Sequence, residues 1–102
     1  MLKKAIIAAT AIVALLPLAA SAGEIQNRLN DQHARIHQGL VDGALSPVEA
    51  HRLAWADDRI AAERDRDLRA NGGHLTPGEF DRLNRQENDI SNRIAFDEHF
   101  HR

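Results

Sequence analysis

The chain has 102 residues, with 13 Lys and Arg, 15 Asp and Glu, six His, one Trp and no Cys. This length allows one small domain at most and leaves no room for a large active-site cleft. The absence of Cys excludes disulfide bonds, thiolate metal sites and a cysteine nucleophile. The formal net charge of -2 argues against nucleic acid as a partner, because phosphates need a basic surface.

The first 22 residues have the pattern of a secretory signal peptide. Lys3 and Lys4 form a basic start, an apolar stretch covers residues 5–18, and Ala-Ser-Ala at 20–22 is a small-residue cleavage site before Gly23. The stretch is shorter than the roughly 20 residues of a membrane-spanning helix. We therefore expect a periplasmic protein that is not a lipoprotein, because it has no Cys, and that does not stay in the membrane after signal cleavage.

Residues 23–102 are expected to form one small helical domain with a limited core. Only 18 of these 80 residues are large and apolar (Ile, Leu, Val, Phe or Trp). Domains of this size usually need additional stabilisation from self-association, a metal or a partner protein.

An internal repeat organises this domain, because residues 43–60 recur 30 positions later as residues 73–90. Seven of the 18 aligned positions are identical. In each copy Ser46 or Thr76 is placed to cap a helix, a Glu three positions later completes a capping box, and a Pro takes the first helical position. The glycines upstream, Gly43 and Gly72-Gly73, suit the left-handed end of a preceding helix. Each copy therefore predicts a helix end, a turn and a helix start.

These signals predict three helices, over residues 24–41, 47–70 and 77–99. Apolar side chains with helical spacing mark one face of each helix: Ile25, Leu29, Ile36 and Leu40; Leu53, Ala56 and Ile60; Phe80, Leu83, Ile90 and Ile94. In the third helix Glu87 interrupts the apolar rhythm. No segment alternates like a strand, so the predicted fold class is all-α, a hooked or antiparallel hairpin-type bundle.

A thin bundle of this kind is expected to offer an apolar groove to itself or to a client. The residues predicted to form this interaction surface are Leu53, Trp55, Ile60, Phe80, Leu83 and Phe96. The expected function is therefore that of a small periplasmic interaction or stress-response protein, chaperone-like, with a protein client or a second copy as partner. Catalysis is not expected, because the acidic residues are scattered along charged helical faces and Ser46 and Thr76 are explained as caps.

The histidines give an alternative function, transition-metal binding. His33 and His37 lie one helical turn apart, which is the spacing with which a helix binds zinc, copper or nickel. His99 and His101 lie near the C-terminus, and the two pairs together would make a tetrahedral site. In the alternative interpretation, the four histidines are ordinary polar residues that face solvent, and the protein binds no cofactor. His51 and His74 are interpreted as ordinary surface or cap residues.

The repeated sequence motifs resemble those of two groups of proteins. The twin Gly-x-Leu-Ser/Thr-Pro-x-Glu boxes, with the stretch from Arg69 to Pro77, resemble a group of small exported bacterial proteins over nearly the whole domain. More distantly, the boxes at residues 45–49 and 75–79 resemble the LTxxQ boxes of the Spy/CpxP-like periplasmic proteins. That resemblance implies a helical, often dimeric envelope-stress chaperone with metal-responsive relatives. Both boxes here have Glu where that family has Gln, and the chain is shorter.

Overall fold

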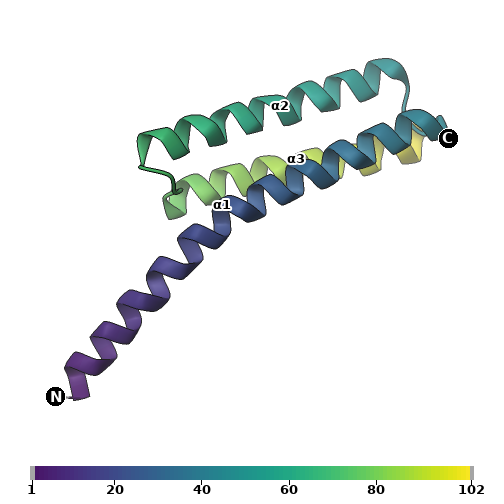
Figure 1. Ribbon diagram of the computed structural model, residues 1–102. Coiled ribbons are helices and arrows are strands. Elements are labelled where there is room, and N and C mark those ends of the chain that lie inside the picture. Colours follow the sequence, from purple (N-terminus) through teal and green to yellow (C-terminus); the bar gives the residue numbers. More distant parts are fainter. Residues whose placement is uncertain (1, 102) are drawn as a thin grey trace.

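The computed structural model describes the backbone of residues 2–101 and the side chains of residues 22–100. It contains the helices α1 (Leu2–Asp42), α2 (Pro47–Ala70) and α3 (Pro77–His101). Short turns fold α2 back along α1 and α3 back along α2, and each helix packs against both others (Figure 1). The part of the chain that the structure describes has no strand, so the predicted all-α fold is confirmed.

Helix α1 is longer than predicted. We expected its start near residue 24, whereas the helix begins at Leu2 and continues through the segment predicted to be a signal peptide. In Figure 1 this N-terminal part extends away from α2 and α3. Ala22 is the first described side chain and packs against the bundle; the side chains of residues 1–21 lie outside the described residues. Within the described residues, no helix has the length and apolar character needed to cross a membrane.

Both predicted capping boxes are present. At the start of α2 the Glu49 N–H donates to Ser46 Oγ at 3.1 Å, and the Ser46 N–H donates to Glu49 Oε1 at 2.8 Å. At the start of α3, Glu79 and Thr76 make the same two hydrogen bonds at 3.1 and 2.8 Å. Each box satisfies backbone N–H groups that the helix itself leaves without partners.

The turn from α2 to α3 is fixed by hydrogen bonds at the end of α2. Gly72 and Gly73 have positive φ angles of 71° and 101°, a conformation that favours glycine. The Gly73 N–H donates to the Leu68 carbonyl at 2.8 Å, which closes the last turn of α2. The Asn71 side chain donates to Glu79 Oε1 at 2.6 Å and so connects the end of α2 to the capping box of α3.

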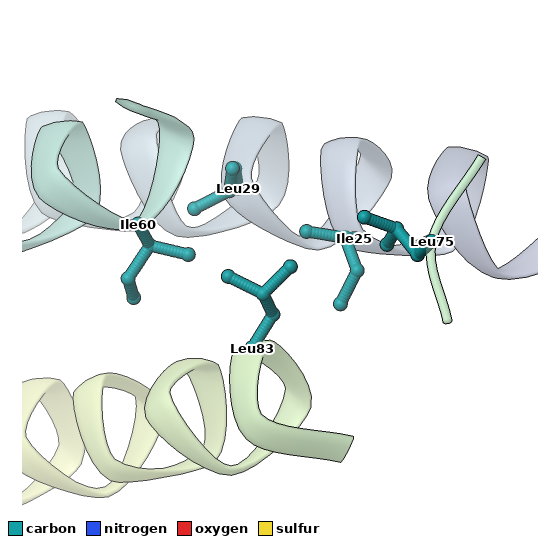
Figure 2. Close-up of a cluster of buried hydrophobic side chains, with 5 residues drawn as sticks. All are labelled: Ile25, Leu29, Ile60, Leu75 and Leu83. Atoms are coloured by element: carbon teal, nitrogen blue, oxygen red, sulfur yellow. The ribbon is translucent and has the colours of Figure 1, made fainter. Parts of the chain in front are cut away.

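Buried apolar side chains form two clusters along the bundle. The first cluster consists of Ile25, Leu29, Ile60, Leu75 and Leu83. Figure 2 shows these side chains pointing toward one another from α1, α2, α3 and the turn before α3. The second cluster consists of Ile36, Leu45, Ala50, Leu53 and Ile94. Ile90 packs against both clusters and connects them.

A layer of buried polar residues separates the two clusters. It contains one residue from each helix, Gln32 from α1, Asp57 from α2 and Glu87 from α3, and none is more than 2% exposed. The Gln32 side-chain amide donates to the Glu87 carbonyl at 2.6 Å and to Ser91 Oγ at 2.8 Å. We refer to Gln32, Asp57 and Glu87 as the polar layer.

The close approach at Gly39 positions the turn between α1 and α2. A Cβ atom at this position would lie 2.7 Å from Leu45 Cδ1 and 2.8 Å from Leu45 Cγ, and 3.2 Å from Glu98 Oε2. Leu45 belongs to the second cluster. Gly39 therefore provides the space in which Leu45 is buried against α1.

We predict that Gly39→Ala destabilises the bundle. The alanine gains about 1 kcal/mol of helix propensity, but displacing the packed Leu45 costs about 1–3 kcal/mol. Urea denaturation followed by circular dichroism measures the difference. Gly78→Ala is the matched control, because nothing lies within 4 Å of its Cβ position. If Gly39→Ala stabilises the protein as much as Gly78→Ala does, the close contact between Leu45 and Gly39 is contradicted.

Candidate functional site

Half of the predicted interaction surface lies inside the bundle. Leu53, Ile60 and Leu83 are at most 4% exposed and belong to the two apolar clusters. They therefore hold the three helices together and do not line an exposed groove, which corrects the prediction. The apolar stripes of α2 and α3 face each other and α1, so the side chains that looked available in sequence are used in the core.

The other three predicted residues lie at or near the surface. Phe80 is half-buried and packs against the first cluster, which contains Leu75, its predicted partner in a hydrophobic staple. Trp55 and Phe96 are each 57% exposed. The Arg59 guanidinium lies 5.0 Å from the centre of the Trp55 ring, which is within the range of a cation–π interaction.

Exposed apolar side chains gather at one end of the bundle. Among the described side chains, six large apolar residues are exposed, and five of them lie in the last turn of α1, the first turn of α2 and the last two turns of α3. These segments meet where the α1–α2 turn lies beside the end of α3 (Figure 1). We call this surface the apolar end; its residues are Leu40, Val41, Val48, Phe96 and Phe100.

An aromatic pair forms the α3 side of the apolar end. Phe96 and Phe100 are four residues apart on α3, so they share one face of the helix. Their ring centroids are 4.5 Å apart, and the His99 ring meets Phe100 edge-on at 4.9 Å. Phe100 is 69% exposed. These rings therefore present a continuous aromatic surface to solvent on α3. A single exposed apolar residue is common on protein surfaces, whereas a contiguous patch indicates a binding role.

A shallow groove between α1 and α2 leads toward the same end. It has a volume of about 350 Å³, and its lining is mostly apolar, with three histidines. The lining residues are His33, Ile36, His37, Leu40, Pro47, Ala50, His51 and Ala54. Because Leu40 belongs to both features, the groove extends the apolar end along α1 and α2.

The predicted metal ligands do not come together in the described part of the chain. His33 lies 3.7 Å from the Asp58 carboxylate, His37 lines the α1–α2 groove, and His99 packs against Phe100. Among residues 22–100, no group of three or more His, Asp or Glu side chains could hold a metal ion. The side chain of His101 lies outside the described residues. The described histidines therefore form no assembled site for zinc, copper or nickel.

The polar layer contains the two carboxyl groups with the most unusual environment. Burial raises the pKa of Asp57 to about 6, with nearby His33 opposing the shift. Burial also raises the pKa of Glu87 to about 7, against the effect of the Arg28 guanidinium. Neither residue lines the α1–α2 groove, nor two further surface grooves, one between α2 and α3 and one on α3. A substrate in those grooves would therefore not reach these groups, which is unlike a catalytic acid–base pair.

Sequence reasoning missed the polar layer, although one signal for it exists. The 30-residue repeat aligns Asp57 with Glu87, and both follow an aligned Leu by four positions. A carboxylate at the same point of two apolar stripes indicates a shared position in the core. In the sequence Glu87 was interpreted only as an interruption of the stripe.

Comparison with protein-family models, curated proteins and solved structures finds no match to this chain.

We predict that truncating a core residue and an exposed residue will have different effects on stability. Leu83→Ala removes a fully buried side chain from the first cluster and should cost about 2–5 kcal/mol. Phe96→Ala should change the free energy of unfolding by less than about 1 kcal/mol, because its side chain is largely in water. Thermal and urea denaturation measure both. Equal losses would contradict this division between core and surface.

Proposed function

We propose that the protein is a small periplasmic interaction protein of the stress-response type, which binds apolar segments of non-native client proteins through the apolar end. The observation that carries the proposal concerns residues 22–100: five of the six large apolar side chains exposed in this range lie at one end of the bundle. Exposed apolar patches on small proteins commonly mark sites that bind other proteins. No catalytic step is part of the proposal.

The surface suits short apolar segments without a fixed shape. The Phe96 and Phe100 rings offer an aromatic face on α3, and the α1–α2 groove, which leads toward the same end of the bundle, is shallow and mostly apolar. Such a surface gains free energy from burying apolar area and has few directional groups that would select one sequence. This favours many unfolded segments over one folded partner. The chaperone expectation from the Leu-Ser/Thr-Pro-x-Glu boxes agrees with this mode of binding.

We predict that the protein slows the aggregation of an unfolded substrate, such as reduced α-lactalbumin, in a light-scattering assay. Replacing both aromatic residues (Phe96→Gln with Phe100→Gln) should weaken this effect about tenfold or more, because each ring buried against a client contributes about 1.5–3 kcal/mol. Gln keeps a good helix propensity, so α3 should remain intact. Circular dichroism checks that it does.

The control is Trp55→Gln, which removes an exposed aromatic residue of α2 that lies outside the apolar end. It should retain the protective effect. Loss of protection in the control but not in the double variant would place the binding surface on α2. If sedimentation shows a dimer that the double variant converts to a monomer, and no protection of the substrate is seen, the apolar end serves self-association and the client proposal is wrong.

We further predict that the exported protein begins at Gly23. Cleavage there would keep every residue of both apolar clusters, because the first buried one is Ile25. It would remove Ala22, whose carbonyl accepts a hydrogen bond from Arg64 Nε at 3.1 Å. N-terminal sequencing of protein from a periplasmic extract gives the answer. An intact N-terminus, or protein found only in the membrane fraction, would contradict the predicted signal peptide.

A further inference from the structure

The polar layer presents carboxyl oxygens to the interior without providing hydrogen-bond donors for them. Asp57 and Glu87 are both 0% exposed. Among the described residues, none of their four carboxyl oxygens has a hydrogen-bond partner, and Gln32 Oε1 has none either. A buried carboxylate without donors is costly, and two of them in one layer repel each other as well. Protonation relieves this penalty, because a neutral carboxyl group has a much smaller desolvation cost than a carboxylate and can itself donate a hydrogen bond.

The charged groups around the layer compensate only part of its charge. Facing Glu87 are Arg28 and Glu24 from α1, and Asp57 and Arg64 from α2. The Arg28 Nε atom lies 3.8 Å from Glu87 Oε1, beyond hydrogen-bond distance. Its two terminal nitrogens instead donate to Asn84 and Asn88, each at 2.6 Å. The nearest cation is therefore held by other partners on α3.

The Asp57 side of the layer has still less compensation. Its neighbours are His33 from α1, Asp58 from α2 and Glu87 from α3. His33 is itself 3.7 Å from the Asp58 carboxylate at the surface. No Arg is among the charged groups that act on Asp57. Among the described residues, Arg28 and Arg64 thus compensate part of the charge of Glu87 without a hydrogen bond to its carboxyl group, and His33 compensates part of the charge of Asp57.

We propose that the polar layer is a proton-dependent latch, which holds α1, α2 and α3 together while Asp57 and Glu87 retain a proton and loosens the bundle when both ionise. When both carboxyl groups are ionised, repulsion between Asp57 and Glu87 acts between α2 and α3. Gln32 of α1 lies in the same layer and donates to the Glu87 main-chain carbonyl, so a movement of α3 also affects its packing against α1. The layer also lies between the two apolar clusters. If the helices move apart at this layer, the packing in both clusters is loosened. This property is independent of the proposed client binding.

The direction of the pH effect follows from the folded-state pKa values. Those of Asp57 and Glu87 are raised to about 6 and about 7, above their ordinary values of 3.8 and 4.5. The folded chain therefore binds these protons more tightly than the unfolded chain, and stability falls as the pH rises from about 4 to about 7. A shift of about two units corresponds to about a hundredfold change in the unfolding equilibrium constant for each carboxyl group.

The experiment is urea denaturation of the purified protein at several pH values between 5 and 8. The wild type should lose stability across this range, with an unfolding equilibrium constant that rises at least tenfold. The double variant Asp57→Asn with Glu87→Gln should lose most of this dependence, because neither amide ionises. A second variant, Asp57→Leu with Glu87→Leu, extends the apolar seam and serves if the amides do not fold.

The matched control is Asp65→Asn with Asp81→Asn, which removes two exposed carboxylates from the same two helices. It should keep the wild-type pH dependence. Carbon-13 NMR of the side-chain carboxyl groups in the wild type gives an independent readout, with two groups expected to titrate near neutral pH. Wild-type stability that does not change between pH 5 and 8, variants that keep the full dependence, or normal titration of both carboxyl groups would each overturn the latch.

Discussion

The three helices meet along one narrow seam, into which residues 25–36 of α1, 50–60 of α2 and 83–94 of α3 place about one side chain per helical turn. The buried positions recur every three or four residues, for example at 25, 29, 32 and 36 on α1 and at 50, 53, 57 and 60 on α2. Residues 22–100 form no second layer of core behind this seam. Every residue in it is therefore in contact with the other helices, and a polar one cannot turn away to solvent without opening the bundle.

The seam also explains why apolar side chains are left over. Near the ends of α1 and α3 and at the start of α2, several apolar side chains lie off the buried face of their helix and are exposed. Phe96 and Phe100 continue α3 past Ile94, and Leu40 and Val41 continue α1 past Ile36 and Gly39. The apolar end thus lies at the margin of the core that the three helices share. A bundle built only for stability would have polar residues there.

Local features of the fold were predictable from sequence, whereas features that depend on three helices were not. The capping boxes at Ser46 and Thr76 and the left-handed glycines involve residues close in the chain, so their chemistry can be read directly. Whether Leu53 or Leu83 faces a neighbour or a client depends on how the helices are arranged. The same limit applies to Leu45, which is buried only because Gly39 lets it approach α1.

The repeat has a consequence for the centre of the molecule. Two copies of one helix that pair antiparallel are related by an approximate twofold axis, and a residue on that axis faces its own copy. Ile60 of the first copy meets Leu83 of the second in one cluster, and Leu53 meets Ile94 in the other. Asp57 and its counterpart Glu87 lie between these contacts. Duplication of a helix with one acidic residue at this point therefore brings like charge against like charge inside a single chain.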